Sequence, residues 1–273
     1  MRLPRHRDAQ LHSIFERAMF EQRHSLYGWG SGLFALALLM CLLYPTVRSN
    51  PALATLHETY PKALRSLFGI TNLATGTGFL RAELFSVVAP MLVIVLAVLW
   101  GGDTIAGEEE RGTINLLLSN PVTRWRVLLE KWAALLAGVV AVCGGLAAGL
   151  AIGSPLARLD IAWSRLAAAI LATALLGALF ASVALALGAA SGRRGLARGV
   201  ASLLAVASYL LSSLANLISW LAPLKGLSPW YHALGVDPLS RGLQLDHVSI
   251  VAAMTLFAAG VAVVGFERRD LAV

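Results

Sequence analysis

The sequence predicts an all-α integral membrane protein with six transmembrane helices. Of its 273 residues, 58% are hydrophobic and only 14% are charged, whereas a soluble domain carries about 25% charged residues. Six stretches of 19 to 27 residues contain no Asp, Glu, Lys or Arg, and each can cross about 30 Å of hydrocarbon as a helix. They lack the alternation of barrel strands, the other structure that can span lipid. We expect spans at about 26–46, 84–102, 132–154, 166–190, 199–222 and 247–266, in a single domain covering 1–273.

Before the first span, residues 8–23 have the apolar spacing of an amphipathic helix. The apolar positions on one face are Leu11, Ile14, Phe15, Ala18 and Met19. Arg17 lies off that face, so we interpret the segment as a helix in the membrane interface. A disordered basic tail is the alternative. The first 23 residues lack the apolar core of a cleavable signal peptide.

A charged amphipathic segment, Gly107 to Trp132, separates the second and third apolar runs. The three carboxylates of Glu108–Glu110 suit the first turn of a helix, where the macrodipole favours negative charge. A solvated charged turn is the alternative for them. Asn120-Pro121 then interrupts the helix, and both residue types are favoured where a new helix begins. We therefore expect a short helix, a turn and a helix that enters the membrane.

Glycines recur at four-residue spacing in the third span, at Gly145, Gly149 and Gly153. Small residues at this spacing let helix backbones approach closely. The spacing is compatible with packing inside one chain or with a dimer face. After the fifth span, Trp230, Tyr231 and His232 lie among prolines, and we interpret these aromatic residues as an anchor at the headgroup level.

The positive charges predict that both termini are cytoplasmic. In that orientation, 14 of the 22 Lys and Arg residues fall in cytoplasmic segments, as the positive-inside rule requires. The net charge of +7 then reflects topology and contact with lipid headgroups. We expect the lipid bilayer, and no nucleic acid, as a partner.

No catalytic, metal or cofactor site is expected in this chain. Both cysteines, Cys41 and Cys143, fall in apolar runs and match no disulfide or zinc pattern. The phosphate-binding pattern G-x-x-x-x-G-K-[ST] needs a Gly-Lys pair, and the lysines Lys62, Lys131 and Lys225 follow Pro, Glu and Leu. No span carries a charge near its middle, which argues against an ion-coupled pump or a voltage sensor. The chain is therefore not expected to be an enzyme by itself.

The segment from Asp103 to Trp132 resembles the cytoplasmic loop of ABC-2 type transporter permeases. The family pattern is roughly G-E-x-E-x-G-T-x-x-x-L-L-x-x-P-[VL]-[ST]-R. It is matched by Gly107, Glu108, Glu110, Gly112, Thr113, Leu117, Leu118, Pro121, Val122, Thr123 and Arg124. The amphipathic first helix, the segment SPWYHALGVDPLSRGL and the terminal FERRDL also agree, so the resemblance covers the whole chain. The overall form is similar to the permease of nitrous oxide reductase maturation and to drug-export permeases.

The resemblance implies the transmembrane subunit of an ABC exporter, with ATP hydrolysed by a separate cytoplasmic ATP-binding subunit. It implies a coupling helix between spans 2 and 3 that docks on that subunit. The coupling residues would be Gly107, Glu108, Glu109, Glu110, Arg111, Gly112, Thr113, Leu117, Leu118, Pro121, Thr123, Arg124 and Trp125. ATP and Mg would bind to the partner, and two copies of the permease would pair with two ATPases in a prokaryotic plasma (inner) membrane.

Three functions remain compatible with these features. The first is export of an amphipathic or hydrophobic molecule. The second is mechanical transmission of ATPase motion to an extracytoplasmic partner, with no solute moved. The third is a membrane scaffold that needs no nucleotide. Copurification with an ATPase would exclude the scaffold, and stimulation of ATP hydrolysis by a substrate would favour the exporter over the transmitter.

Overall fold

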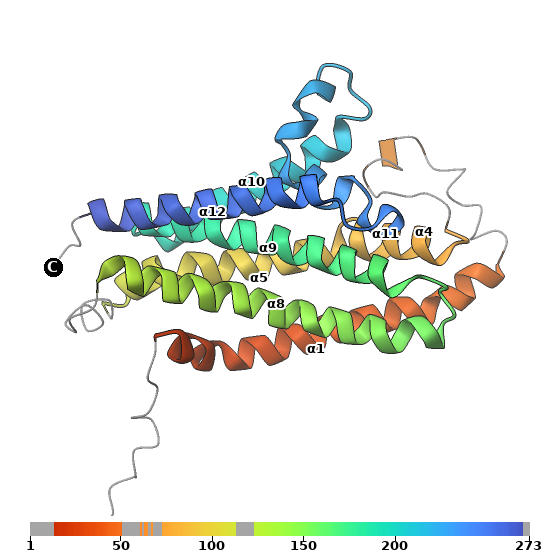
Figure 1. Ribbon diagram of the computed structural model, residues 1–273, viewed down its shortest axis with the longest axis horizontal. Coiled ribbons are helices and arrows are strands. Elements are labelled where there is room, and N and C mark those ends of the chain that lie inside the picture. Colours follow the sequence, from red (N-terminus) through yellow and green to blue (C-terminus); the bar gives the residue numbers. More distant parts are fainter. Residues whose placement is uncertain are drawn as a thin grey trace, which may run out of the picture.

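The computed structural model describes residues 14–50, 61, 63–64, 67, 73–112 and 123–269. Within these ranges the chain forms helices and turns and no strand, and six helical segments are long and apolar enough to cross a membrane. They are Ile14–Ser49, Gly76–Glu110, Arg124–Leu156, Trp163–Ser191, Arg194–Leu214 and Leu245–Arg268. The predicted all-α fold with six spans is therefore confirmed (Figure 1).

Five of the spans are single helices, and the second is composite. The single helices are α1 (Ile14–Ser49), α8 (Arg124–Leu156), α9 (Trp163–Ser191), α10 (Arg194–Leu214) and α12 (Leu245–Arg268). The second span consists of α4 (Gly76–Leu80), the π-helical η2 (Arg81–Phe85), α5 (Val88–Gly102), the π-helical η3 (Asp103–Gly107) and α6 (Glu108–Glu110). Three short elements follow α10, namely η4 (Ala222–Leu227), η5 (Tyr231–Gly235) and α11 (Pro238–Arg241).

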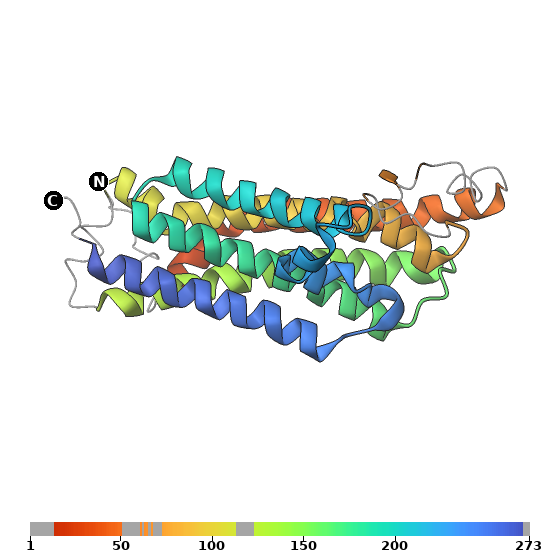
Figure 2. The same cartoon turned by 90° about the horizontal axis from the view of Figure 1, so that it is seen from above.

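Helix α9 lies at the centre of the bundle (Figures 1 and 2). It packs against α5, α8, α10 and α12, whereas α1 packs mainly against α8. A Cβ at Gly101 of α5 would overlap the carbonyl oxygen of Ala181 of α9, so the two backbones are nearly in contact. The hydrophobic effect does not drive helices together in lipid, and close backbone packing of this kind stabilises the bundle instead.

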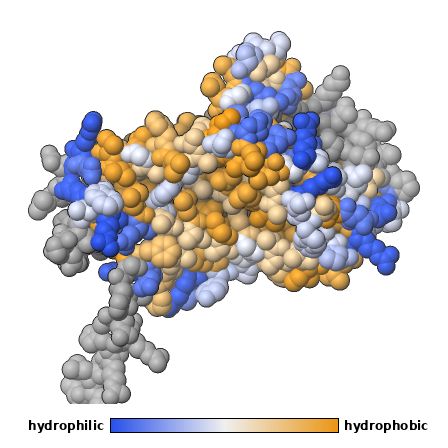
Figure 3. Space-filling model, in the orientation of Figure 1, coloured by the Kyte–Doolittle hydropathy of each residue, from blue (hydrophilic) through white to orange (hydrophobic). Residues whose placement is uncertain are grey.

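Hydrophobic side chains cover the middle of the face shown in Figure 3, and hydrophilic ones gather toward both ends. Large apolar side chains of the spans are exposed, among them Leu203 (67%) and Phe257 (75%). An apolar surface of this extent is an aggregation liability in water. In a bilayer it is the surface that faces the lipid tails.

The three glycines of α8 face α1 of the same chain. A Cβ at Gly145 would overlap the carbonyl oxygen of Gly30, and one at Gly149 would overlap that of Phe34. At Gly153 the added atom would lie 2.6 Å from the Cβ of Cys41. Packing within one chain therefore accounts for the close approach at all three glycines, and a dimer face on them stays a prediction.

The described part of the amphipathic segment predicted at 8–23, residues 14–23, is continuous with the first span. Helix α1 has no break between Ile14 and Ser49, while Leu11 lies outside the described residues. Of the other predicted residues, Phe15 and Met19 are half-buried, as is Ile14, and Arg17 is exposed. That this part of α1 lies in the membrane interface stays a prediction.

The fifth span is shorter than the predicted 199–222, because α10 ends at Leu214. Two buried serines give the physical reason. The hydroxyl of Ser228 donates to the carbonyl of Ser208 at 2.7 Å, and the N–H of Trp230 donates to Ser208 Oγ at 3.0 Å. These bonds hold residues 228–230 against α10. The chain must therefore leave the helix and reverse its direction between Leu214 and Ser228. Hydropathy does not reveal this reversal of the chain, because residues 215–224 contain no charged side chain.

Two of the three residues interpreted as a headgroup anchor, Trp230 and His232, are buried in the bundle, and the anchor interpretation is wrong for these two. Trp230 is 3% exposed and packs edge-on against Tyr209, with ring centroids 5.0 Å apart. His232 is 9% exposed, and its ring nitrogens lie 2.7 Å from His247 Nδ1 and 2.7 Å from the carbonyl oxygen of Gly226. These contacts fix the segment to the helices, which the spacing of aromatics alone does not reveal.

Candidate functional site: the charged end of the bundle

The segment between the second and third spans is the functional candidate, and the structure describes both of its ends. These ends are residues 107–112 and 123–125, whereas Thr113, Leu117, Leu118 and Pro121 lie outside the described residues. Both ends lie where α1 begins and α12 ends (Figure 1). We call this the charged end, because its ion pairs join Asp103, Glu108, Glu109, Glu110, Lys131, Arg194, Arg198 and Arg269.

Two glycines shape the first end of the segment. A Cβ at Gly107 would lie 2.7 Å from Asp103 Oδ1, so glycine leaves room for that carboxylate. Gly112 has a φ of 70°, and its N–H donates to the carbonyl of Glu109 at 2.9 Å. Glycine adopts this left-handed geometry without strain and commonly ends helices in this way. The chain therefore leaves α6 in a defined direction.

The second helix begins later than the predicted start at Asn120-Pro121. Helix α8 begins at Arg124, and Thr123 before it is extended, with φ −71° and ψ 140°. The carbonyl of Thr123 accepts from the N–H groups of Arg126 at 3.1 Å and Val127 at 3.2 Å. Threonine is β-branched and favours extended backbone over helix, which suits it to the last position before the helix.

Asp103 and Glu110 bind the start of α10. Arg198 Nη2 lies 2.6 Å from Asp103 Oδ2, and Arg194 Nη1 lies 3.4 Å from Asp103 Oδ1. Arg194 also approaches a Glu110 oxygen at 3.3 Å, and its backbone N–H donates to Glu110 Oε1 at 2.9 Å. Two carboxylates and two guanidinium groups thus form a network, which contributes more than isolated surface pairs.

Glu109 joins the segment to the end of α12. Arg269 Nη1 donates to Glu109 Oε2 at 3.0 Å, and Nη2 is paired with Oε1. This is the bidentate arrangement that makes Arg–carboxylate pairs strong and directional. Arg124 Nη1 donates to the carbonyl of Arg269 at 3.0 Å. Arg269 therefore contacts both ends of the segment.

Glu108 is paired with Lys131 of α8 in the least exposed part of the network. The side chains are 19% and 5% exposed, respectively. Lys131 Nζ also donates to the carbonyl of Thr104 at 3.1 Å. A buried charge is tolerated when it is paired and hydrogen-bonded, so this pair fixes α6 against α8. Nearby, the N–H of Ile14 donates to Glu130 Oε2 at 3.0 Å, which adds the start of α1 to the same assembly.

These contacts divide the described coupling residues into two groups. The three glutamates are engaged within the chain and hold the segment in place. Arg111, Gly112, Thr123 and Trp125 are exposed, and Trp125 is the largest apolar one, at 48% exposure. Tryptophan and arginine are enriched at protein interfaces. The exposed group is therefore accessible to another protein, as is the exposed Glu110, and the coupling role of these residues stays a prediction.

The partners of the glutamates were not identified from the sequence. Lys131, Arg194, Arg198 and Arg269 all lie at the boundaries of apolar runs. The sequence does indicate that such pairs form, because charges at the same end of neighbouring spans must lie close together. Which cation meets which glutamate depends on how the helices pack, and that is visible only in three dimensions.

The charged end holds anion–cation pairs rather than a metal site. Across residues 14–50, 73–112 and 123–269, no group of three or more His, Cys, Asp or Glu side chains is placed to hold a metal ion. The carboxylates instead lie against lysine and arginine. The charged end connects five helices, namely α1, α6, α8, α10 and α12, and an exposed surface lies beside it.

Comparison with known proteins agrees with this architecture. No curated protein matched the chain. A family model described as ABC-2 family transporter protein matches residues 13–271, a range that includes all six spans and the charged end. The chain therefore belongs to the ABC-2 family and is a multi-pass membrane subunit of an ABC transporter, distinct from the ATPase and a partner of an ABC ATP-binding subunit.

Proposed function

We propose that this chain is the permease of an ATP-driven exporter and that the charged end is where a separate ATP-binding subunit docks. ATP and Mg²⁺ bind to that subunit, and the charged end faces the cytoplasm of a prokaryotic cell. The observation that supports this most is the connectivity of the segment. Glu108 connects it to α8, Glu109 to α12 and Glu110 to the start of α10.

Motion of the docked subunit would reach the spans through these pairs. Helix α8 runs without a break for 33 residues from Arg124, and an α-helix rises about 1.5 Å per residue. It therefore extends from the docking surface across the whole membrane as one stiff element. Helix α1 would move with it, because the glycines of α8 hold the two backbones in contact. This is gating by movement, of the kind that often limits turnover.

The proposed substrate is an amphipathic or hydrophobic molecule that passes between two copies of the permease. In the described spans, Asp, Glu, Lys and Arg occur only toward the ends. A charge at the bilayer centre costs about 2.5–3.5 kcal/mol on insertion scales and is kept where ion coupling requires it. The spans thus present a mainly apolar surface, which suits an apolar substrate.

Substitution of Trp125 by Ala is expected to weaken binding of the ATP-binding subunit about 30-fold. Removing a buried interface tryptophan typically costs about 2 kcal/mol or more, and 1.4 kcal/mol corresponds to tenfold. The measurement is the dissociation constant between the purified permease variant and the ATP-binding subunit, supported by copurification of the two from cells.

Trp163→Ala is the matched control for this experiment. Like Trp125, Trp163 is an exposed tryptophan at the start of a helix, with 54% exposure. Its helix, α9, begins at the opposite end of the bundle (Figure 1). Its replacement should leave the dissociation constant unchanged. If Trp125→Ala binds the ATPase as tightly as Trp163→Ala does, the docking assignment is wrong.

Transport is tested separately, in vesicles that contain the permease and its ATP-binding subunit. An exporter is expected to move a fluorescent amphiphile in an ATP-dependent manner and to hydrolyse ATP faster when that amphiphile is present. A complex that docks the ATPase but shows neither effect with a panel of amphiphiles would act as a mechanical transmitter. That outcome would reject export while leaving the docking site intact.

A further inference from the structure

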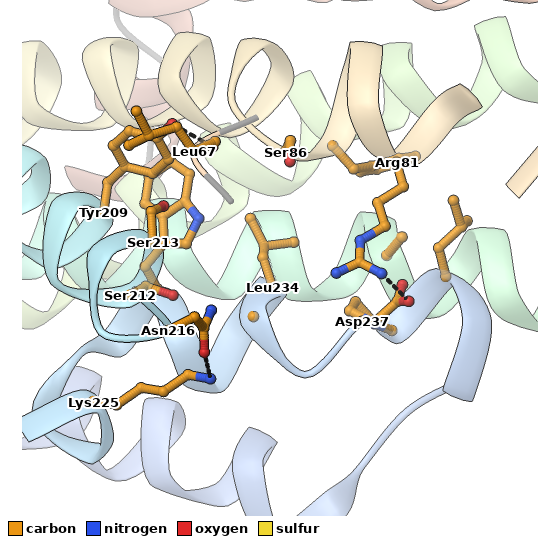
Figure 4. Close-up of a pocket in the computed structure, with 16 residues that line it drawn as sticks. Leu67, Arg81, Ser86, Tyr209, Ser212, Ser213, Asn216, Lys225, Leu234 and Asp237 are labelled. Carbon is orange, nitrogen blue, oxygen red and sulfur yellow. Dashed lines mark hydrogen bonds and ion pairs between the residues drawn. The ribbon is translucent and has the colours of Figure 1, made fainter. Parts of the chain in front are cut away.

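A polar pocket lies between the last turn of α10, η2 and residues 225–239 (Figure 4). Its empty volume is about 620 Å³, including the part open to solvent. The polar side chains at its wall include Arg81, Tyr209, Ser212, Asn216, Lys225 and Asp237. Along α10, the pocket residue Tyr209 lies 11 positions beyond Arg198 of the charged end, or about 16 Å of helix. The docking proposal therefore does not account for the pocket.

One positive charge at this pocket is not balanced by a carboxylate. Arg81 Nη1 lies 2.5 Å from Asp237 Oδ2, so these two charges cancel. Lys225 Nζ instead donates to the neutral amide oxygen of Asn216 at 2.7 Å and lies 4.5 Å from the centre of the Tyr231 ring. In the part of the chain that the structure describes, no carboxylate forms an ion pair with Lys225. The wall groups thus carry a net positive charge.

The surroundings of Lys225 favour a bound anion. Partial burial lowers the pKa of the Lys225 ammonium, which means that water solvates the charge less well here than on an open surface. An ammonium has three N–H donors, and the Asn216 oxygen accepts one of them. An anion in the pocket would accept another in a charge-assisted bond, which is about twice as strong as a neutral one. Ser212 and Tyr209 line the same space, but the Tyr209 hydroxyl already donates to the carbonyl of Leu67 at 2.6 Å.

The segment that carries Lys225 also exposes large apolar side chains. Leu224 and Leu227 of η4 are 40% and 70% exposed, and Trp220 just before it is 70% exposed. This part of the chain projects from the side of the bundle (Figure 1). Exposed apolar groups beside a polar pocket mark a place where a ligand with both characters can bind. The anionic group would enter the pocket, and the apolar part would lie along η4.

We propose that this pocket binds the anionic group of an amphipathic molecule, a phosphate or a carboxylate, with Lys225 as its ionic partner. The Ser212 side chain lies beside the anion, and the Arg81–Asp237 pair forms the opposite wall (Figure 4). This site goes beyond the proposed export function. It is tested on the permease alone, so failure of ATPase docking or of transport would not affect it.

The test measures ligand binding to the purified full-length protein in detergent by native mass spectrometry. The probes are phosphatidylglycerol, phosphatidylcholine and glycerol phosphate. Lys225→Gln is expected to bind phosphatidylglycerol about tenfold more weakly than the unchanged protein, because one bond to a charged group is lost. Binding of phosphatidylcholine should change less, because its choline ammonium offsets the charge of its phosphate. Glycerol phosphate identifies the source of the anion: Lys225-dependent binding of this probe indicates a soluble phosphate, and binding of the lipid alone indicates a headgroup.

Arg241→Gln is the matched control, since it removes an exposed positive charge of α11 that does not line the pocket. It should leave binding of phosphatidylglycerol unchanged, and Lys225→Arg should retain most of it. The proposal is overturned if Lys225→Gln binds normally, or if Arg241→Gln loses as much.

A second variant keeps the test independent of any folding defect at Lys225. Ser86→Cys places a thiol at a half-exposed position of the pocket wall, and the native Cys41 and Cys143 are both buried. Phosphatidylglycerol is expected to slow labelling of that thiol by a water-soluble maleimide at least severalfold. Labelling at the same rate with and without the lipid would show that the pocket stays empty.

Discussion

Lys131→Met is expected to lower the free energy of unfolding by about 3–5 kcal/mol, the usual cost of removing one partner of a buried ion pair. Lys131 is 5% exposed, and its ammonium lies against Glu108 and donates to the carbonyl of Thr104. Methionine fills a similar volume but leaves the Glu108 carboxylate without this neighbouring charge. The measurement is the unfolding free energy of the purified protein in detergent, with its melting temperature as a second readout.

Arg126→Gln controls for loss of a positive charge on the same helix. Arg126 is paired with Glu130 at 3.0 Å, but its side chain is 63% exposed, and such i, i+4 pairs contribute about 0.5 kcal/mol or less. The double variant Lys131→Met with Glu108→Gln should lose less than the sum of the two single losses, because residues in contact are not additive. Equal effects of Lys131→Met and Arg126→Gln would mean that the Glu108–Lys131 pair does not fix α6 to α8.

The same pair shows how far the sequence could predict this site. The segment Gly107 to Trp132 is predicted from its charges, from Asn120-Pro121 and from its resemblance to a family loop. The roles of Glu108, Glu109 and Glu110 could not be read in the same way. Glu109 meets Arg269, 160 positions later in the chain, and no local pattern connects residues so far apart. The three glutamates, which the resemblance places among the coupling residues, form ion pairs within the subunit.

Hydropathy predicts the number of spans, because the bilayer thickness sets the length of apolar helix that a span requires. It was less accurate where a span is ended by specific contacts. Ser208 holds Ser228 and Trp230 against α10, and this return of the chain places Lys225 beside Asn216. The polar pocket thus arises from the part of the fold that composition could not predict.

Gly145→Ala is expected to destabilise the protein by about 1–3 kcal/mol, the usual cost of overpacking. The added Cβ would overlap the carbonyl oxygen of Gly30. That oxygen belongs to backbone, which cannot rotate away as a side chain would, so α1 must move from α8. Gly149→Ala should behave in the same way, because its Cβ would overlap the carbonyl oxygen of Phe34 and lie 2.8 Å from the Cβ of Ala37.

Gly144→Ala distinguishes this steric effect from a change in helix propensity. It lies one position away on the same helix, and a Cβ there would meet no atom within 4 Å. Alanine is favoured over glycine in a helix interior by up to about 1 kcal/mol, so this variant should be as stable as the unchanged protein or more stable. If all three variants gave the same melting temperature, α1 and α8 would not be in contact through their glycines. The continuous connection from the docking surface through α8 to α1 would then be lost, and a dimer face on these glycines would remain compatible with the sequence.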